Sequence, residues 1–159
     1  MQVFMLRNPA RYVFIQTDGP VILFDFPNCE HLSEGIETID EVREATTLSY
    51  VASGENLYDN AKSWAKEIAD LMRQHAGDNK KIAIDYSPSV GAIELAKEGY
   101  EVVDGQEPIK HARSIKNKQE IEAMKISVRT AEAGMIRMQQ ALQPGITENE
   151  LWSHLHQTN

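Results

Sequence analysis

The chain has 159 residues, with 16 basic and 24 acidic side chains that give a formal net charge of −8 at pH 7. This length allows one full domain, or one domain and part of a second. The acidic balance argues against a nucleic-acid partner because no concentrated basic face offsets it, and the apolar runs are too short to cross a membrane.

Residues 11–16 and 21–26 are rich in β-branched and aromatic side chains, and a Thr-Asp-Gly-Pro turn separates them, so they predict a β-hairpin. The segment 30–44 is rich in acidic residues, and its apolar residues show no sustained period. It therefore predicts a solvated connection with at most a short helix. Residues 46–51 predict a third strand.

A helical period follows from residue 56, and its apolar positions recur at spacings of three and four. They are Ala61, Trp64, Ala65, Ile68, Leu71, Met72 and His75. Gly77 ends this helix, residues 81–86 predict a strand, a helix begins at Ser87-Pro88 and ends at Gly99, and residues 100–103 return as a strand. The succession predicts an α/β fold with a mixed sheet flanked by helices.

A basic linker over residues 110–118 leads to a long helix, which Asn117 and Glu120 open as a capping box. The helix carries an apolar seam that predicts pairing with another helix or a sheet. The seam residues are Ile121, Met124, Val128, Ala131, Met135, Met138 and Leu142. Thr147 and Glu150 open a last helix, which we expect to be the truncated start of a further element.

Two motifs in this second half, Arg113-Ser-Ile-Lys116 and Pro144-Gly-Ile-Thr-Glu148, stand on either side of the long helix with its Glu120-Ile121 pair. Together they resemble the junction between the two domains of the creatinase/prolidase (M24) family of metallopeptidases. The resemblance implies a creatinase-type N-terminal domain with a ribonuclease-H-like motif over residues 1–106, lacking its first strand. Residues 107–159 would be the linker and opening helices of a truncated "pita-bread" catalytic domain.

In that family, two Asp, one His and two Glu hold two divalent metal ions, which would be Mn, Co or Zn. These ligands would lie beyond Asn159, so the resemblance implies no catalytic and no metal-binding residue in this chain. It also implies a homodimer in which the N-terminal domain narrows the partner's substrate entrance. Phe4, Arg7 and Arg11 are the candidates to approach a peptide or small-molecule substrate.

We therefore expect the non-catalytic N-terminal portion of an Xaa-Pro peptidase-like hydrolase. The alternative is a stand-alone dimerisation or ligand-binding module with no catalytic parent. Cys29, the single cysteine, cannot form an internal disulfide, and the chain has neither an Asn-x-Ser/Thr acceptor nor a secretory signal pattern. These features favour a cytoplasmic protein.

Overall fold

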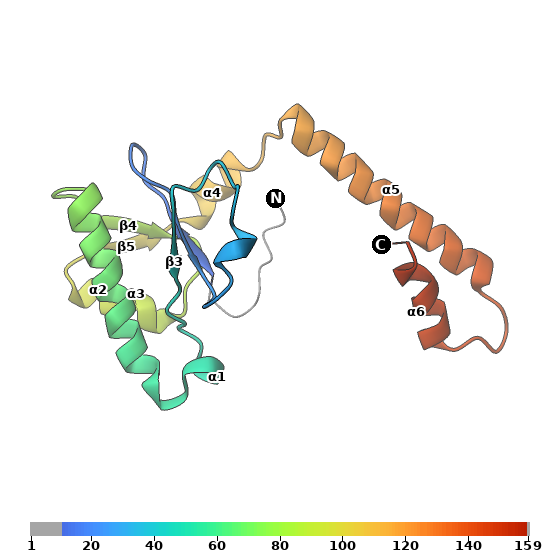
Figure 1. Cartoon of the computed structure of the whole chain (residues 1–159), viewed down its shortest axis with the longest axis horizontal. Helices are drawn as coiled ribbons and strands as arrows, with labels where there is room; N and C mark the ends of the chain where they lie inside the picture. The colour runs from blue at the N-terminus through green and yellow to red at the C-terminus, as the bar shows by residue number, and fades with distance from the viewer. Residues whose placement is uncertain (1–10, 159) are drawn as a thin grey trace. The chain divides into compact units, whose positions relative to one another are not determined.

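A computed structural model describes residues 11–158, and its contacts divide the chain into two compact units, Met1–Ile109 and Lys110–Asn159. The first unit holds strands β1–β5 and the helices among them, and the second holds α5 and α6 (Figure 1). The assignment of residues 107–159 to the start of a catalytic domain stays a prediction.

A three-stranded sheet opens the first unit. Strands β1 (Tyr12–Phe14) and β2 (Ile22–Asp25) pair antiparallel, which confirms the predicted hairpin. Strand β3 (Glu41–Glu44) lies parallel to β2 on its other side, so β2 is the central strand. All four residues of β2 are buried, as its position requires.

The position of the third strand was predicted wrongly. It falls inside the acidic segment 30–44, after the short 3-10 helix η1 (Glu30–Leu32). Strand β3 is at the edge of its sheet, and Glu41 and Glu44 are exposed, so its sequence carries no apolar alternation. Its pairing comes from β2, which a local pattern does not reveal.

The predicted strand over residues 46–51 is instead a turn into helices. Leu48 is buried, but Tyr50 and Val51 are exposed and belong to α1 (Tyr50–Ser53). The 3-10 helix η2 (Gly54–Asn56) then leads directly into α2.

Helix α2 (Leu57–His75) is the main buried helix of the unit, and it confirms the predicted period. Every predicted apolar position is buried except His75, which is half-buried at the end of the helix. Gly77 follows with φ of 58°, in the left-handed conformation that favours glycine after a helix.

Strands β4 (Lys81–Ile84) and β5 (Glu101–Asp104) are parallel and are connected by α3 (Ser89–Lys97), as predicted. Among the described residues, however, they form a separate two-stranded sheet and do not continue the first one. Pro88 occupies the N-cap position of α3, and the Ser87 hydroxyl does not cap it but donates to the Pro88 carbonyl at 3.1 Å.

One hydrophobic core joins the two sheets. Helix α2 lies against α3 (Figure 1). Side chains from β2, α2 and α3 belong to one buried cluster. Ile82, Ile84 and Val102 pack against the same cluster from the second sheet. The mixed α/β class is therefore confirmed, with its strands divided between two small sheets.

Gly105, after β5, is buried and leaves no room for a side chain. A Cβ atom there would lie 2.9 Å from the Ile84 carbonyl carbon and 3.0 Å from the Asp85 nitrogen. Because both are backbone atoms, we expect Gly105→Ala to lower the free energy of unfolding by about 2 kcal/mol. Urea unfolding followed by circular dichroism measures this.

Gly35 provides the control for that substitution. It is exposed and has open space around its Cβ position, although its φ is 77°. Gly35→Ala should therefore cost only the strain of a left-handed alanine, about 1 kcal/mol. A Gly105→Ala variant as stable as the parent chain would contradict the close approach to β4.

The second unit follows a short helix, α4 (Gln106–Ala112), which was predicted as linker. Helices α5 (Lys118–Ala141) and α6 (Glu148–His156) form an antiparallel hairpin (Figure 1). Both predicted capping boxes are present: Asn117 with Glu120, and Thr147 with Glu150.

Candidate functional site

Two of the three predicted substrate-proximal residues, Phe4 and Arg7, lie outside the described residues. The third, Arg11, precedes β1 and is held by a buried carboxylate. Its Nη2 donates to Oδ2 of Asp25 at 2.5 Å and to Oγ of Ser33 at 3.2 Å. Asp25 is 1% exposed, so Arg11 enters an interior ion pair.

The Asp25 carboxylate is well supplied with donors. Besides Arg11, the Ser33 hydroxyl donates to Oδ2 at 3.1 Å and the Phe26 backbone N–H donates to Oδ1 at 2.8 Å. These donors give both carboxylate oxygens hydrogen-bond partners, as a buried polar group requires. The Arg11–Asp25–Ser33 cluster thus joins the start of β1, the end of β2 and the turn after η1, and it acts as a structural anchor.

Sequence reasoning missed Asp25 and Ser33. The available signal was the position of Asp25 between Phe24 and Phe26, because an acid inside an apolar strand is buried only with a partner. The partner itself, 14 residues earlier, could not be identified from spacing.

A second group of charges surrounds Arg43 on β3. Its Nε donates to Oε1 of Glu41 at 2.6 Å, which lowers the pKa of Glu41, and its Nη1 lies 3.6 Å from Oε1 of Glu67 on α2. Partial burial raises the pKa of Glu67. Arg43 and Glu67, together with Lys66 and Asp70, are the charged residues that line a groove here, and their mixed charges favour no particular ligand.

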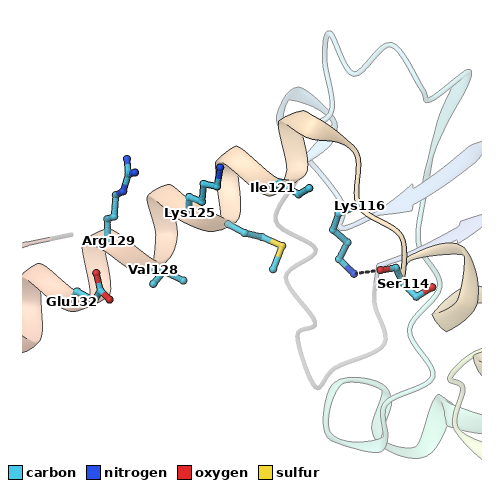
Figure 2. A pocket seen from close by; sticks show the side chains of 8 residues that line it. Ser114, Lys116, Ile121, Lys125, Val128, Arg129 and Glu132 are labelled. Carbon is cyan, nitrogen blue, oxygen red and sulfur yellow. Dashed lines mark hydrogen bonds between the residues drawn. The ribbon is translucent and has the colours of Figure 1, made fainter.

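The other groove follows α5 in the second unit. Its apolar floor residues are Ile121, Met124 and Val128. Lys125, Arg129 and Glu132 also line it (Figure 2). The three floor residues are between 41% and 56% exposed although they are apolar. This part of the predicted seam is therefore uncovered within its own unit, whereas Met138, nearer the end of the helix, is half-buried.

Helix α6 packs on α5 around Gly134. Gly134, the buried residue of that helix, faces Leu155, whose Cδ1 would lie 2.6 Å from a Cβ atom at Gly134. Arg137 also donates to the Gln157 carbonyl at 3.0 Å. The glycine, which has no Cβ atom, permits this close approach of the two helices.

Neither groove is suited to a metal ion. Within residues 11–158, no three His, Cys, Asp or Glu side chains are grouped so that they could hold one. His156 contacts the Trp152 ring edge-on, at 5.1 Å between centroids. The described residues also contain no helix long and apolar enough to cross a membrane.

Comparison with solved structures finds the X-Pro aminopeptidase of Thermotoga maritima, with a TM-score of 0.60 over 93% of this chain and 38% of the aminopeptidase, at 20% sequence identity. Two curated proteins are similar in sequence. The dimethylsulfoniopropionate lyases DddP of Roseobacter denitrificans and Roseovarius nubinhibens are 31% and 29% identical to the whole of this chain. The predicted resemblance to the creatinase/prolidase family is confirmed.

The chain spans 37% of the length of each DddP lyase and matches their N-terminal part. No protein-family model matches the chain. Members of the creatinase/prolidase family are metalloenzymes, but the described residues offer no ligand set that fits their metal ions. The substrate-proximal roles of Phe4, Arg7 and Arg11 stay predictions.

Proposed function

We propose that this chain is the non-catalytic N-terminal portion of a metal-dependent enzyme of the creatinase/prolidase type. The observation that carries the proposal is that the whole chain matches 37% of the length of each of two related enzymes. The similarity of its fold to part of an aminopeptidase also supports it.

The role we propose for this portion is dimerisation and shaping of the substrate entrance, in a cytoplasmic protein. The Arg11–Asp25–Ser33 cluster supports this role because it fixes the chain where β1 begins. We propose that Phe4, Arg7 and Arg11 approach the substrate; of the three, Arg11 lies within the described residues, where Asp25 binds it. Two divalent metal ions, Mn, Co or Zn, would serve the complete enzyme and would not bind here.

Two reactions are candidates for the complete enzyme. The resemblance of the sequence motifs points to hydrolysis of Xaa-Pro peptides, and the Thermotoga maritima neighbour is named as an X-Pro aminopeptidase. The relatives with the higher sequence identity are named as lyases of dimethylsulfoniopropionate. A fold shared by both activities does not select between them, whereas sequence identity favours the lyase substrate.

The purified 159-residue chain tests the non-catalytic assignment. With Mn²⁺, Co²⁺ or Zn²⁺ added, we expect no turnover of an Xaa-Pro dipeptide or of dimethylsulfoniopropionate. Calorimetric titration with each metal should show no binding tighter than about millimolar, because carboxylates that are not grouped bind divalent ions weakly. Turnover of either substrate would contradict the proposal.

A further inference from the structure

Two Asp-Gly dipeptides occur in the chain, Asp18-Gly19 and Asp104-Gly105, and there is no Asn-Gly dipeptide. In an Asp-Gly pair, the backbone nitrogen of the glycine attacks the side-chain carboxyl of the aspartate with little steric hindrance, because glycine has no Cβ atom beside that nitrogen. Both pairs belong to the first unit, but their surroundings differ, so we expect only one of them to react.

The Asp18-Gly19 pair lies in the hairpin loop between β1 and β2. Thr17, Asp18 and Gly19 are all exposed. Within the part of the chain that the structure describes, neither the Asp18 carboxylate nor the Gly19 N–H has a hydrogen-bond partner. No contact with another described residue therefore keeps the nitrogen and the carboxyl apart.

The Asp104-Gly105 pair is held in place by hydrogen bonds. The Gly105 N–H donates to the Ile84 carbonyl at 2.9 Å, and the Gly105 carbonyl accepts from the Ile109 N–H at 3.3 Å. Gly105 is buried, and Asp104 pairs with Ile84 at the end of the sheet. Because a backbone nitrogen must give up its hydrogen bond before it attacks, this pair reacts only after β4 and β5 separate.

We propose that Asp18 is a site of spontaneous isoaspartate formation and that Asp104 is not. In the first step, the Gly19 nitrogen bonds to the side-chain carboxyl carbon of Asp18, and its proton leaves with the carboxyl hydroxyl as water. The product is a five-membered succinimide ring. In the second step, water adds to one ring carbonyl and breaks the bond of that carbonyl to the nitrogen. Opening at the side-chain carbonyl restores aspartate, whereas opening at the main-chain carbonyl leaves isoaspartate.

Isoaspartate changes the loop but not the strands. The main chain then runs through the side chain of residue 18, which adds one carbon atom and leaves a free α-carboxylate. Residues 15–21 lie inside the Phe14–Ile22 pair that closes the hairpin, so the extra atom lengthens a loop and does not shift the strand register. The exposed α-carboxylate is the group that an isoaspartyl methyltransferase would accept as its substrate.

Peptide mapping tests the proposal. The 159-residue chain is kept folded at neutral pH in heavy-oxygen water, digested with trypsin in ordinary water, and treated with an isoaspartyl methyltransferase and labelled S-adenosylmethionine. We expect heavy oxygen and methylation in the peptide of residues 12–43, which contains Asp18. We expect neither in the peptide of residues 98–110, which contains Asp104.

Two controls separate the roles of residue 18 and of the fold. Asp18→Glu should abolish both signals in the first peptide, because a six-membered ring forms far more slowly. In urea, where both pairs are released, both peptides should react. The proposal would be overturned if the two peptides of the folded chain reacted alike, or if Asp18 reacted in urea and not in the folded chain. Signals in residues 12–43 that persist in the Asp18→Glu variant would also overturn it, because they would come from another residue.

Discussion

Replacing Phe24 by alanine is expected to lower the free energy of unfolding by about 4 kcal/mol. Phe24 is fully buried in the central strand β2, and its ring stacks on that of Tyr12 at 4.6 Å between centroids. The truncation removes a large apolar surface from the core and leaves a cavity between β2 and α2. Urea unfolding followed by tryptophan fluorescence measures the loss.

An exposed aromatic residue is the matched control. Tyr86, after β4, is 73% exposed, and Tyr86→Ala should change the free energy of unfolding by less than about 0.5 kcal/mol. If both variants lost the same small amount, the assignment of Phe24 to the core would be wrong.

Arg11→Ala has the second large expected effect, a loss of about 3 kcal/mol. The substitution leaves the carboxylate of Asp25 in the interior without its cation, and Asp25 is 1% exposed. The double variant R11A/D25A should lose less than the sum of the two single variants, because it removes the buried charge together with its partner.

The ion pair of Arg73 and Asp70 is the control that shows how much of the loss is due to burial of the Arg11–Asp25 pair. Its N–O distance is also 2.5 Å, but its side chains are 48% and 59% exposed. Arg73→Ala should therefore cost less than about 1 kcal/mol in the same urea experiment. Equal losses for Arg11→Ala and Arg73→Ala would show that Arg11 is not anchored as described.

The sequence predicted correctly those elements whose interacting residues lie close together along the chain. The period of α2 and the two capping boxes were visible because a helix places its apolar side chains and its caps at fixed short spacings. The hairpin was visible because its two strands adjoin one turn.

The features that were missed depend on distant partners. Strand β3 exists because β2 pairs with it, and Asp25 is buried because Arg11 and Ser33 reach it. For the candidate site, the apolar residues of α5 were predicted from their spacing, whereas the place where α6 packs on this helix required the contact of Gly134 with Leu155.

The coding sequence that follows the codon of Asn159 tests the central claim most directly. A metal-dependent enzyme of the creatinase/prolidase type predicts an in-frame continuation that encodes the two Asp, one His and two Glu ligands. A stop codon directly after Asn159 in the natural gene would contradict the proposed enzyme and would favour the stand-alone module.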